Sequence, residues 1–400
     1  MPALSPRALA IPPSPTLDLD TQAKALKAQG LDVVNLSIGE PDYPTPANVC
    51  QAAIEAIKEG FTRYTPTAGI GPLREAISQK LKKDNNLDYA PESVVVAAGG
   101  KHALYNAFMC LCQPGDEVII PSPHWVTYPA QSTMVGAIPV LAPTDPETLL
   151  LTPEGLKKAL SPRSRVLVLN SPSNPSGRAY GANDLEKLAP LIKAKDLWVI
   201  SDDIYENLIY DGLTFVNLPM VCPELKDQTV ICHGVSKTYS MTGWRIGWLA
   251  GPKIVAQAAA NLQGHMTSNA SSVAQRAALA ALTGPSDEAL RFRAGFNQRR
   301  LRILELLAKI PGFQTPTPNG AFYVFPKVSQ LLGRELGGAM IHSADDLARV
   351  ILEKTLVATT PGTGFGAPDR LRLSYAVDLS NLEKALNRIA SLVAGRPVVL

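Results

Sequence analysis

The 400-residue chain lacks the features of several protein classes. Its five cysteines include no C-x-x-C pair and its five histidines no H-E-x-x-H motif, which argues against a disulfide scaffold and a metal site. Neither sign of charge is in large excess, because 38 basic and 35 acidic residues give a formal net charge of +3 at pH 7. A nucleic-acid groove would need a clustered basic surface, so we expect none.

Long hydrophobic runs are also missing. No stretch of about 18 apolar residues occurs, and the N-terminal MPALSPRALAIPPSP has no apolar core of signal-peptide length. With 46% hydrophobic residues the chain can still bury a large core, and its length favours two or three domains. We expect a soluble, cytoplasmic protein that acts on small molecules.

Apolar, strand-like runs alternate with helical patterns through the central part of the chain. These runs are rich in Val and Ile and mostly lack polar alternation, as expected for parallel strands that helices cover on both faces. The pattern predicts an α/β domain with a mostly parallel central sheet. The predicted strands are 93–98, 117–121, 165–170, 197–202, 229–232 and 246–250.

Short polar motifs mark the expected starts of helices. Thr152 before Pro153 is typical of an N-cap followed by a first-turn proline. Asn183 and Ser380 are each followed three residues later by glutamate, the spacing of a capping box. A long helical pattern covers about 286–310, and its arginines are expected on solvated faces. These are Arg291, Arg293, Arg299, Arg300 and Arg302.

The last third of the chain has a different pattern. The segments GAFYVFP and RLRLSYA indicate strands between helical stretches, which predicts an α+β module with antiparallel pairing. The first 45 residues are too irregular to form a domain alone. We therefore expect a large α/β domain over 46–288, and a small domain made of 1–45 and 289–400.

Polar residues follow neighbouring predicted strands where these end. Asn174 follows one strand, Asp202 and Tyr205 lie at the end of the next, and Lys237 follows the third. Taken singly, such residues are usually turn formers and helix caps. Because ligands collect at the carboxyl ends of parallel strands, an amide, a carboxylate, a phenol and an amine at one rim indicate a binding site.

Three further features add an anion site and a flat surface. A predicted strand ends in Gly99 and Gly100, and a helical pattern starts at about Lys101 or His102, so a phosphate can approach free N–H groups there. Arg245 can clamp a phosphate, and Trp125 can stack on a planar ring. A partly desolvated Lys237 would be a nucleophile toward an aldehyde. Pyridoxal 5'-phosphate is the cofactor that needs all of these groups.

Several segments resemble, in order and spacing, the fold-type-I pyridoxal-phosphate aminotransferases. They are RYTPTAGIGPLREAI, GGKHAL, SPSNPSG, SDDIY, SKTYSMTGWRIG and RLRLSYA. SIGEPDYPTP, PHWVTYP and MTGWRIGW are most similar to the bacterial and plastid aspartate aminotransferases of the class I beta branch. The resemblance implies a homodimer that moves an amino group between L-aspartate and 2-oxoglutarate in a ping-pong cycle.

The resemblance also implies roles around the cofactor ring. Lys237 would bond to the cofactor aldehyde and then move protons as base and acid. Asp202 would pair with the pyridine N–H, and Tyr205 and Asn174 would hydrogen-bond the ring oxygen. Trp125 would stack on the ring.

Phosphate and substrate contacts follow from the same resemblance. The backbone at Gly100 and Lys101, with Ser236 and Arg245, would hold the phosphate, and Tyr64 would reach the phosphate of the partner subunit. The substrate contacts would be Arg372 on the α-carboxylate, helped by Asn174, Trp125 and the backbone at Gly39, and Lys101 on the distal carboxylate. Arg370, in the same strand as Arg372, is expected to face solvent.

The chain departs from the family pattern at three places. His124 stands where a tyrosine is usual, and Gly234 where related enzymes use a hydroxyl on the phosphate, so Ser236 or Ser240 would replace it. Members that transaminate prephenate have a lysine at the place of Pro12. The absence of that lysine argues against prephenate as a substrate. The alternatives are transamination of aromatic donors, alanine or prephenate, and a lyase reaction on the same cofactor.

Overall fold

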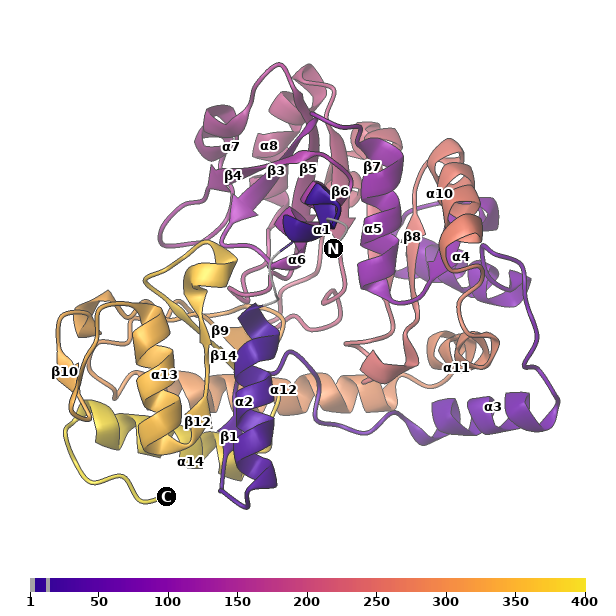
Figure 1. The fold of residues 1–400 in the computed structure, drawn as a ribbon. Coiled ribbons are helices and arrows are strands. Elements are labelled where there is room, and N and C mark those ends of the chain that lie inside the picture. Colours follow the sequence, from indigo (N-terminus) through magenta and orange to yellow (C-terminus); the bar gives the residue numbers. More distant parts are fainter. Residues whose placement is uncertain (1–3, 12–14) are drawn as a thin grey trace.

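The computed structural model describes residues 4–11 and 15–400. Its centre is a seven-stranded sheet with the order β2-β8-β7-β6-β5-β3-β4 (Figure 1). All neighbouring pairs are parallel except those of β8, which runs antiparallel to β2 and to β7. The strands are β2 Val94–Ala97, β3 Glu117–Ser122, β4 Ile138–Pro143, β5 Ser164–Asn170, β6 Trp198–Asp202, β7 Thr229–Gly234 and β8 Gly247–Ala250.

Every predicted strand of this sheet is confirmed to within two residues at each end, and one strand was missed. The missed strand is β4, which lies at the sheet edge and leaves Ile138 and Leu141 exposed. Its sequence IPVLAP carries two prolines, which weakens a strand signal but is tolerated at an edge. The antiparallel direction of β8 was also not foreseen, because an apolar run has no directional signal.

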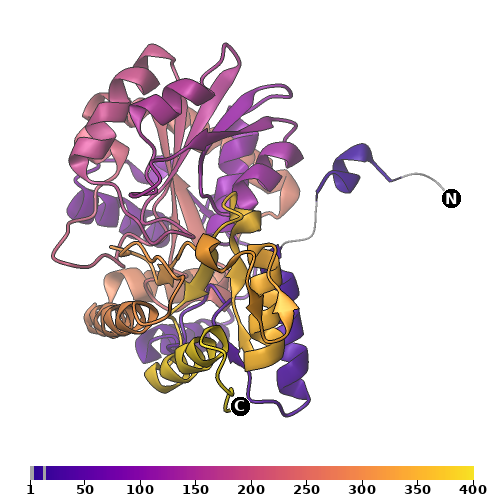
Figure 2. The same cartoon turned by 90° about the vertical axis from the view of Figure 1, so that its left-hand side faces the viewer.

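Helices cover both faces of the sheet, as its apolar strands require (Figure 2). Along β5, Val166 and Val168 pack into the cluster that contains α5, whereas Leu167 and Leu169 pack into the cluster that contains α8. The helices of residues 47–283 are α3 Ala47–Lys58, α4 Gly71–Asn85, α5 Gly100–Leu111, α6 Thr127–Met134, α7 Pro153–Ala159, α8 Ala182–Ala194, α9 Leu218–Val221, α10 Lys253–Met266 and α11 Ser272–Thr283.

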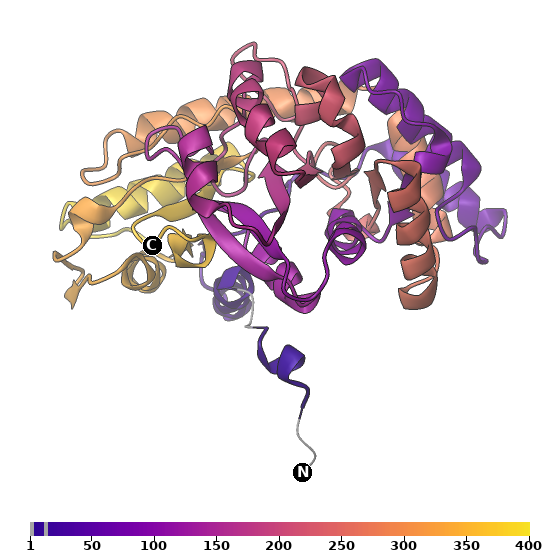
Figure 3. The ribbon, with the colours of Figure 1, turned by 90° about the horizontal axis from the view of Figure 1, so that it is seen from above.

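The second module is built on a three-stranded antiparallel sheet, β13-β14-β9, which confirms the predicted pairing. The N-terminal segment packs on it, because β1 pairs in parallel with β12 and α2 lies beside this pair. Helix α1 lies apart from the body in Figures 2 and 3. The elements are α1 Pro6–Leu9, α2 Pro15–Ala28, β1 Val34–Asn35, α12 Asp287–Leu307, β9 Tyr323–Val324, β10 Glu335–Leu336, β11 Ala339–Met340, α13 Ala344–Thr355, β12 Val357–Ala358, β13 Thr360–Pro361, β14 Leu371–Ser374 and α14 Leu379–Val393.

The predicted helix caps are partly right. Thr152 accepts a hydrogen bond from the Gly155 N–H at 3.1 Å, as expected of an N-cap. The Asn183 prediction is wrong, because α8 begins after Gly181 and its capping carboxylate comes from residue 184. The Ser380 prediction is also wrong, because Asp378 caps α14. In both segments several short polar side chains compete for one position, and the spacing rule does not choose between them.

Two arginines of α12 are buried rather than solvated. Arg300 is 1% exposed and donates to the Asp211 carboxylate at 2.8 Å and to the Pro318 carbonyl at 2.8 Å. Arg299 forms an ion pair with Asp42 at 2.6 Å. Both charges are therefore compensated by acids that lie far away in the sequence, which helical periodicity does not reveal. Across residues 4–11 and 15–400, no helix combines the length and apolarity needed to cross a membrane.

Candidate active site

A cavity of about 510 Å³ lies where the carboxyl ends of β5, β6 and β7 face the second module. It brings together all the predicted site residues except Tyr64, which is 91% exposed and lies outside it. The predicted residues that line the cavity are Gly39, Gly100, Lys101, Trp125, Asn174, Asp202, Tyr205, Ser236, Lys237, Arg245 and Arg372.

Lys237 follows β7 and points its ammonium group into this cavity. Its Nζ donates a hydrogen bond to the Gly39 carbonyl at 2.5 Å, a contact that joins residues nearly two hundred positions apart. Burial lowers the pKa of Lys237 to about 8; the Glu40 carboxylate opposes this shift, and Arg372 and Arg245 reinforce it. About one tenth of this amine is therefore neutral and nucleophilic at pH 7, far more than for an ordinary lysine.

Asp202 ends β6, where it pairs with Cys232 of β7, and its side chain is buried and interacts electrostatically with Lys237. Its Oδ2 accepts from the Tyr128 hydroxyl at 2.7 Å and its Oδ1 from the Ile204 N–H at 3.3 Å. Burial raises the pKa of Asp202, while the bond from Tyr128 works in the opposite direction. A carboxylate held in this way favours a cationic partner, since burying it unpaired is costly.

Asn170, the last residue of β5, positions Asn174. Its side-chain Nδ2 donates to the Asp202 carbonyl at 2.9 Å, and its Oδ1 accepts from the Asn174 N–H at 2.9 Å. The Asn174 side chain in turn accepts from Arg372 Nη1 at 3.0 Å. The amide at this rim is thus fixed between the sheet and the second module.

Arg372 lies on β14 and is 3% exposed. Nη1 bonds the Asn174 side chain, Nη2 bonds the Ser37 carbonyl at 2.5 Å, and the buried Nε has no acceptor among the described residues. Burial lowers the pKa of Arg372, although a guanidinium keeps its charge. The expectation for Arg370 was wrong, because that side chain is buried and donates to the Phe325 carbonyl at 2.9 Å.

The N-terminus of α5 and Arg245 form one cationic corner of the cavity. A Cβ atom at Gly99, which has a φ of 89°, would lie 2.3 Å from Arg245 Nη2, so glycine is required where the guanidinium passes. The first N–H groups of α5 have no intrahelical acceptors and carry the positive end of the helix dipole. Gly100 and Arg245 therefore present an anion site.

Position 234 has a steric reason to be glycine. A Cβ atom there would lie 2.8 Å from the Ile246 carbonyl oxygen on the neighbouring strand. Of the two hydroxyls considered as replacements, Ser236 lines the cavity, whereas Ser240 donates to the Tyr43 carbonyl. The geometry thus leaves Ser236 as the hydroxyl available to a ligand in this corner.

Trp125 and Lys101 also line the cavity. The Lys101 ammonium group lies 4.9 Å from the Trp125 ring centroid, within cation–π range, and the indole meets the Tyr128 ring edge-on. His124 does not line this cavity; its ring is buried against Gly366, and burial lowers its pKa. The histidine that stands here in place of the usual tyrosine therefore packs against the loop at Gly366 and does not line the main cavity. Pro12 lies outside the described residues.

The lining residues that the sequence reasoning missed include Tyr128, Asn170 and Tyr323. Tyr128 had a signal, because it follows Trp125 by three residues at the start of α6 and so shares its face. Asn170 had a signal as the last residue of a buried strand. Tyr323 had none, because it reads as a core aromatic of β9.

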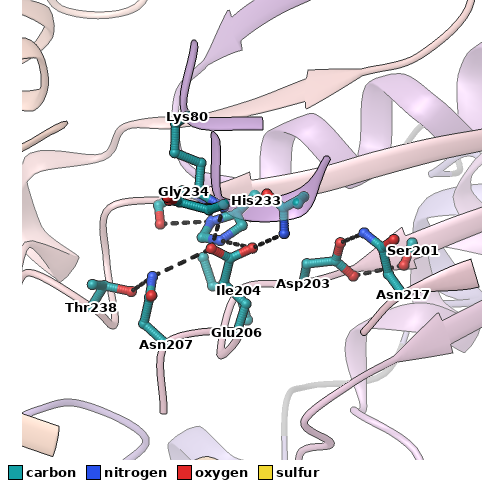
Figure 4. Close-up of polar contacts among 12 residues, drawn as sticks. Lys80, Ser201, Asp203, Ile204, Glu206, Asn207, Asn217, His233, Gly234 and Thr238 are labelled. Atoms are coloured by element: carbon teal, nitrogen blue, oxygen red, sulfur yellow. Dashed lines mark hydrogen bonds and ion pairs between the residues drawn. The ribbon is translucent and has the colours of Figure 1, made fainter. Parts of the chain in front are cut away.

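A buried charged cluster joins α4, the turn after β6 and the end of β7 (Figure 4). Lys80 of α4 forms an ion pair with Glu206, whose Oε2 lies 3.3 Å from His233 Nε2 and 3.2 Å from Asn85 Nδ2. The side chains of Lys80 and Glu206 are only 9% and 4% exposed. Because Glu206 follows Tyr205, and His233 lies three residues before Ser236, this cluster holds the two segments that carry the cavity residues.

These groups define an enzyme site for small anionic carbonyl compounds. A nucleophilic amine, a buried carboxylate and a cationic corner face one cavity, and a buried arginine with an unpaired N–H faces the same space. The model for the aminotransferases of class I and II matches residues 31–389, and the chain belongs to this family.

Relatives and solved structures agree over nearly the whole chain. The aspartate aminotransferase of Geobacillus stearothermophilus is 45% identical, over 98% of this chain and 99% of the relative. The aspartate/prephenate aminotransferase of Nitrosomonas europaea is 42% identical, over 98% of this chain and all of the relative. The solved aspartate aminotransferase of Rhizobium meliloti superposes with a TM-score of 0.94 at 40% identity, covering 98% and 99% of the two chains.

Proposed function

We propose that the protein is a pyridoxal-phosphate-dependent aminotransferase that moves an amino group between L-aspartate and 2-oxoglutarate by a ping-pong mechanism. The observation that carries the proposal is the convergence on one cavity of Lys237 after β7, Asp202 at the end of β6 and Arg372 of β14 in the second module. The names of the relatives support the amino donor.

The residues present fit this cofactor. Arg245 lies against the glycine that begins α5, which leaves an anion cradle for the phosphate, and Asp202 is a buried carboxylate suited to a pyridine N–H. Trp125 would stack on the ring, Tyr205 and Asn174 would bond its oxygen, and Gly100, Lys101 and Ser236 would complete the phosphate contacts. When bound, the cofactor supplies an electron-withdrawing ring that stabilises negative charge developing on the substrate α-carbon.

Proton transfer at the α-carbon is the task of Lys237. Its lowered pKa places the amine close to the working pH of a general base, and the Gly39 carbonyl orients Nζ within the cavity. Asp202 would keep the ring nitrogen protonated, because an anionic carboxylate beside it disfavours loss of that proton. Tyr205 would hold the ring oxygen by a hydrogen bond.

Arg372 would bind the substrate α-carboxylate. Its Nε is buried without an acceptor among the described residues, and Asn174 fixes one side of the guanidinium. Lys101, at the mouth of the cavity beside Trp125, would meet the distal carboxylate of a dicarboxylate substrate. Two cations from different elements, Lys101 of α5 and Arg372 of β14, support an acidic amino donor over alanine or an aromatic one.

A homodimer forms part of the proposal. Tyr64 follows α3 and is almost fully exposed, and Ile54 and Ile57 on α3 are exposed apolar neighbours that a second copy could cover. Tyr64 would then reach the phosphate of the partner subunit. Analytical ultracentrifugation that finds only monomers of the cofactor-loaded protein would contradict this part.

The domain boundaries and the cytoplasmic location are also part of the proposal. Three apolar clusters within 49–281, and one made mostly of residues 292–393 together with Val34 and Leu36, support domains of 46–288 and of 1–45 with 289–400. Tyr205 belongs by sequence to the first domain, but its side chain packs into the core of the second module. Five cysteines, all free, fit a cytoplasmic protein.

Visible absorbance with a panel of amino acids tests the proposal. Wild-type protein loaded with cofactor should show a visible band that L-aspartate changes, and Lys237→Ala should lack it. Lys253→Ala, at an exposed lysine of α10, is the matched control and should keep the band. Protein that acquires no band from added cofactor would overturn the proposal.

Steady-state kinetics test the choice of donor and the type of reaction. A kcat/KM for tyrosine, alanine or prephenate above that for aspartate would overturn aspartate as the donor. Release of pyruvate and ammonia without an acceptor would indicate a lyase.

A further inference from the structure

Tyr323 makes the contact that joins the two sides of the cavity at the proposed position of the ring oxygen. It lies on β9 of the second module, and its side chain is fully buried. Its hydroxyl oxygen is 2.8 Å from that of Tyr205, which comes from the turn after β6. Within the described residues, neither hydroxyl has another hydrogen-bond partner.

The surroundings of Tyr323 hold it firmly in this place. The Arg372 guanidinium lies over its ring, 4.7 Å from the centroid. A Cβ atom at Gly39 would lie 2.7 Å from the Tyr323 hydroxyl, so glycine is needed there for the phenol to reach Tyr205. One side chain therefore touches the arginine, the phenol and the glycine that the proposed function uses.

Tyr205 and Tyr323 together have two hydroxyl protons to donate. Burial raises the pKa of both Tyr205 and Tyr323, so both are protonated at neutral pH. Each hydroxyl has one proton to donate and can accept two bonds. If Tyr205 donated to Tyr323, its only proton would point away from the ring oxygen. If Tyr323 donates to Tyr205, the Tyr205 proton stays available for the ligand.

We propose that Tyr323 is a positioning residue whose hydroxyl donates to Tyr205 and so directs the single Tyr205 proton toward the oxygen of the bound ring. This inference rests on the proposed function, because it needs a ring oxygen as the acceptor. Tyr323 acts through Tyr205 and makes no contact of its own with the reacting atoms.

The test is a pH titration of the visible absorbance of the cofactor-loaded protein. A donor to the ring oxygen stabilises the form with more negative charge on that oxygen, which is the form present above the titration midpoint. Tyr323→Phe keeps a ring beneath Arg372 but removes the directing hydroxyl. We expect it to raise the midpoint by about 0.5 to 1 pH unit, the effect of one neutral hydrogen bond.

Two further variants separate direction of a proton from general structural damage. In a Tyr205→Phe background, Tyr323→Phe should cause no additional shift of the midpoint, because its effect passes through the Tyr205 hydroxyl. Tyr375→Phe is the matched control; Tyr375 is also fully buried and donates to the Ala321 carbonyl at 3.2 Å, away from the cavity. It should leave the midpoint unchanged.

The outcomes distinguish this inference from the proposed function. A wild-type protein that takes up no cofactor contradicts the proposed function itself. A normal wild-type band with an unshifted midpoint in Tyr323→Phe overturns the role of Tyr323 alone. The role is equally refuted if Tyr323→Phe shifts the midpoint by the same amount with and without the Tyr205 hydroxyl, or if Tyr375→Phe shifts it as much.

Discussion

Replacing Lys80 by methionine should destabilise the protein, because it leaves the Glu206 carboxylate buried without its ammonium partner. Removing one member of a buried ion pair costs about 3–5 kcal/mol. Methionine preserves the apolar stem of the side chain, so the change isolates the charge. Asn85 and His233 still contact Glu206, so we expect the lower end of this range, about 3 kcal/mol.

The effect on the melting temperature follows from the size of the chain. An unfolding entropy of about 2.1 cal/mol/K per residue gives about 0.84 kcal/mol/K for 400 residues. A loss of about 3 kcal/mol therefore lowers Tm by about 4 °C. Thermal unfolding followed by circular dichroism at neutral pH measures this, with urea unfolding as a second determination.

Lys309→Met provides the matched control. Lys309 forms an exposed ion pair with Glu305 one helical turn away, and such pairs contribute little to stability. It should leave Tm within about 1 °C of the wild type. If Lys80→Met also leaves Tm within that margin, the buried pair does not stabilise the fold and the reasoning is refuted.

The pH dependence of stability provides an independent test of the Lys80–Glu206 ion pair. Burial opposes the charge of Glu206, but Lys80 and His233 outweigh it and lower the pKa of this carboxyl well below its ordinary value. A lowered folded-state pKa contributes stability that is present above the unfolded-state value, about 4.5, and is lost as the pH falls below it. Without Lys80 this contribution shrinks, so the difference in stability between wild type and Lys80→Met should narrow below about pH 4.5.

Two further predictions concern the cavity lysines. Because burial lowers the pKa of Lys237 to about 8, the rate at which cofactor-free protein captures pyridoxal phosphate should rise with pH and level off above about 8. Stopped-flow absorbance measures this rate, and a flat profile between about pH 6 and 9 would contradict the titration of Lys237. Lys101→Ala should lower kcat/KM for aspartate by about ten- to a hundredfold, the effect of one charge-assisted contact, and alter the value for alanine little. Equal losses for both substrates would show that Lys101 does not meet the distal carboxylate.

The strand-end residues were predictable because parallel strands place their carboxyl ends at one edge. Asn174, Asp202 and Lys237 could therefore be brought together from local patterns alone, and the structure places them in one cavity. Gly39 and Arg372 came from the family resemblance, since nothing local distinguishes them from a turn glycine and a surface arginine.

What could not be predicted depends on contacts between distant segments. Tyr323 looks like an ordinary core aromatic until Tyr205, from the other module, meets it at 2.8 Å. Lys80 and Glu206 lie 126 positions apart, and neither has a local pattern that indicates burial. The wrong expectation for Arg299 and Arg300 has the same origin, because their acidic partners lie outside α12.

Two of the buried arginines of the second module, Arg300 and Arg372, differ in how their charge is compensated. Arg300 is neutralised by the Asp211 carboxylate, whereas Arg372, equally enclosed, meets only the neutral oxygens of Asn174, Ser37 and Thr360 among the described residues. A buried charge without an opposite charge is costly, so the folded protein holds Arg372 at a free-energy cost that a carboxylate reduces on binding. We therefore expect Arg300 to act in stability and Arg372 in recognition, although both come from the same module and the same kind of burial. On this reasoning, a substrate that carries a carboxylate is expected to bind more tightly than one without it.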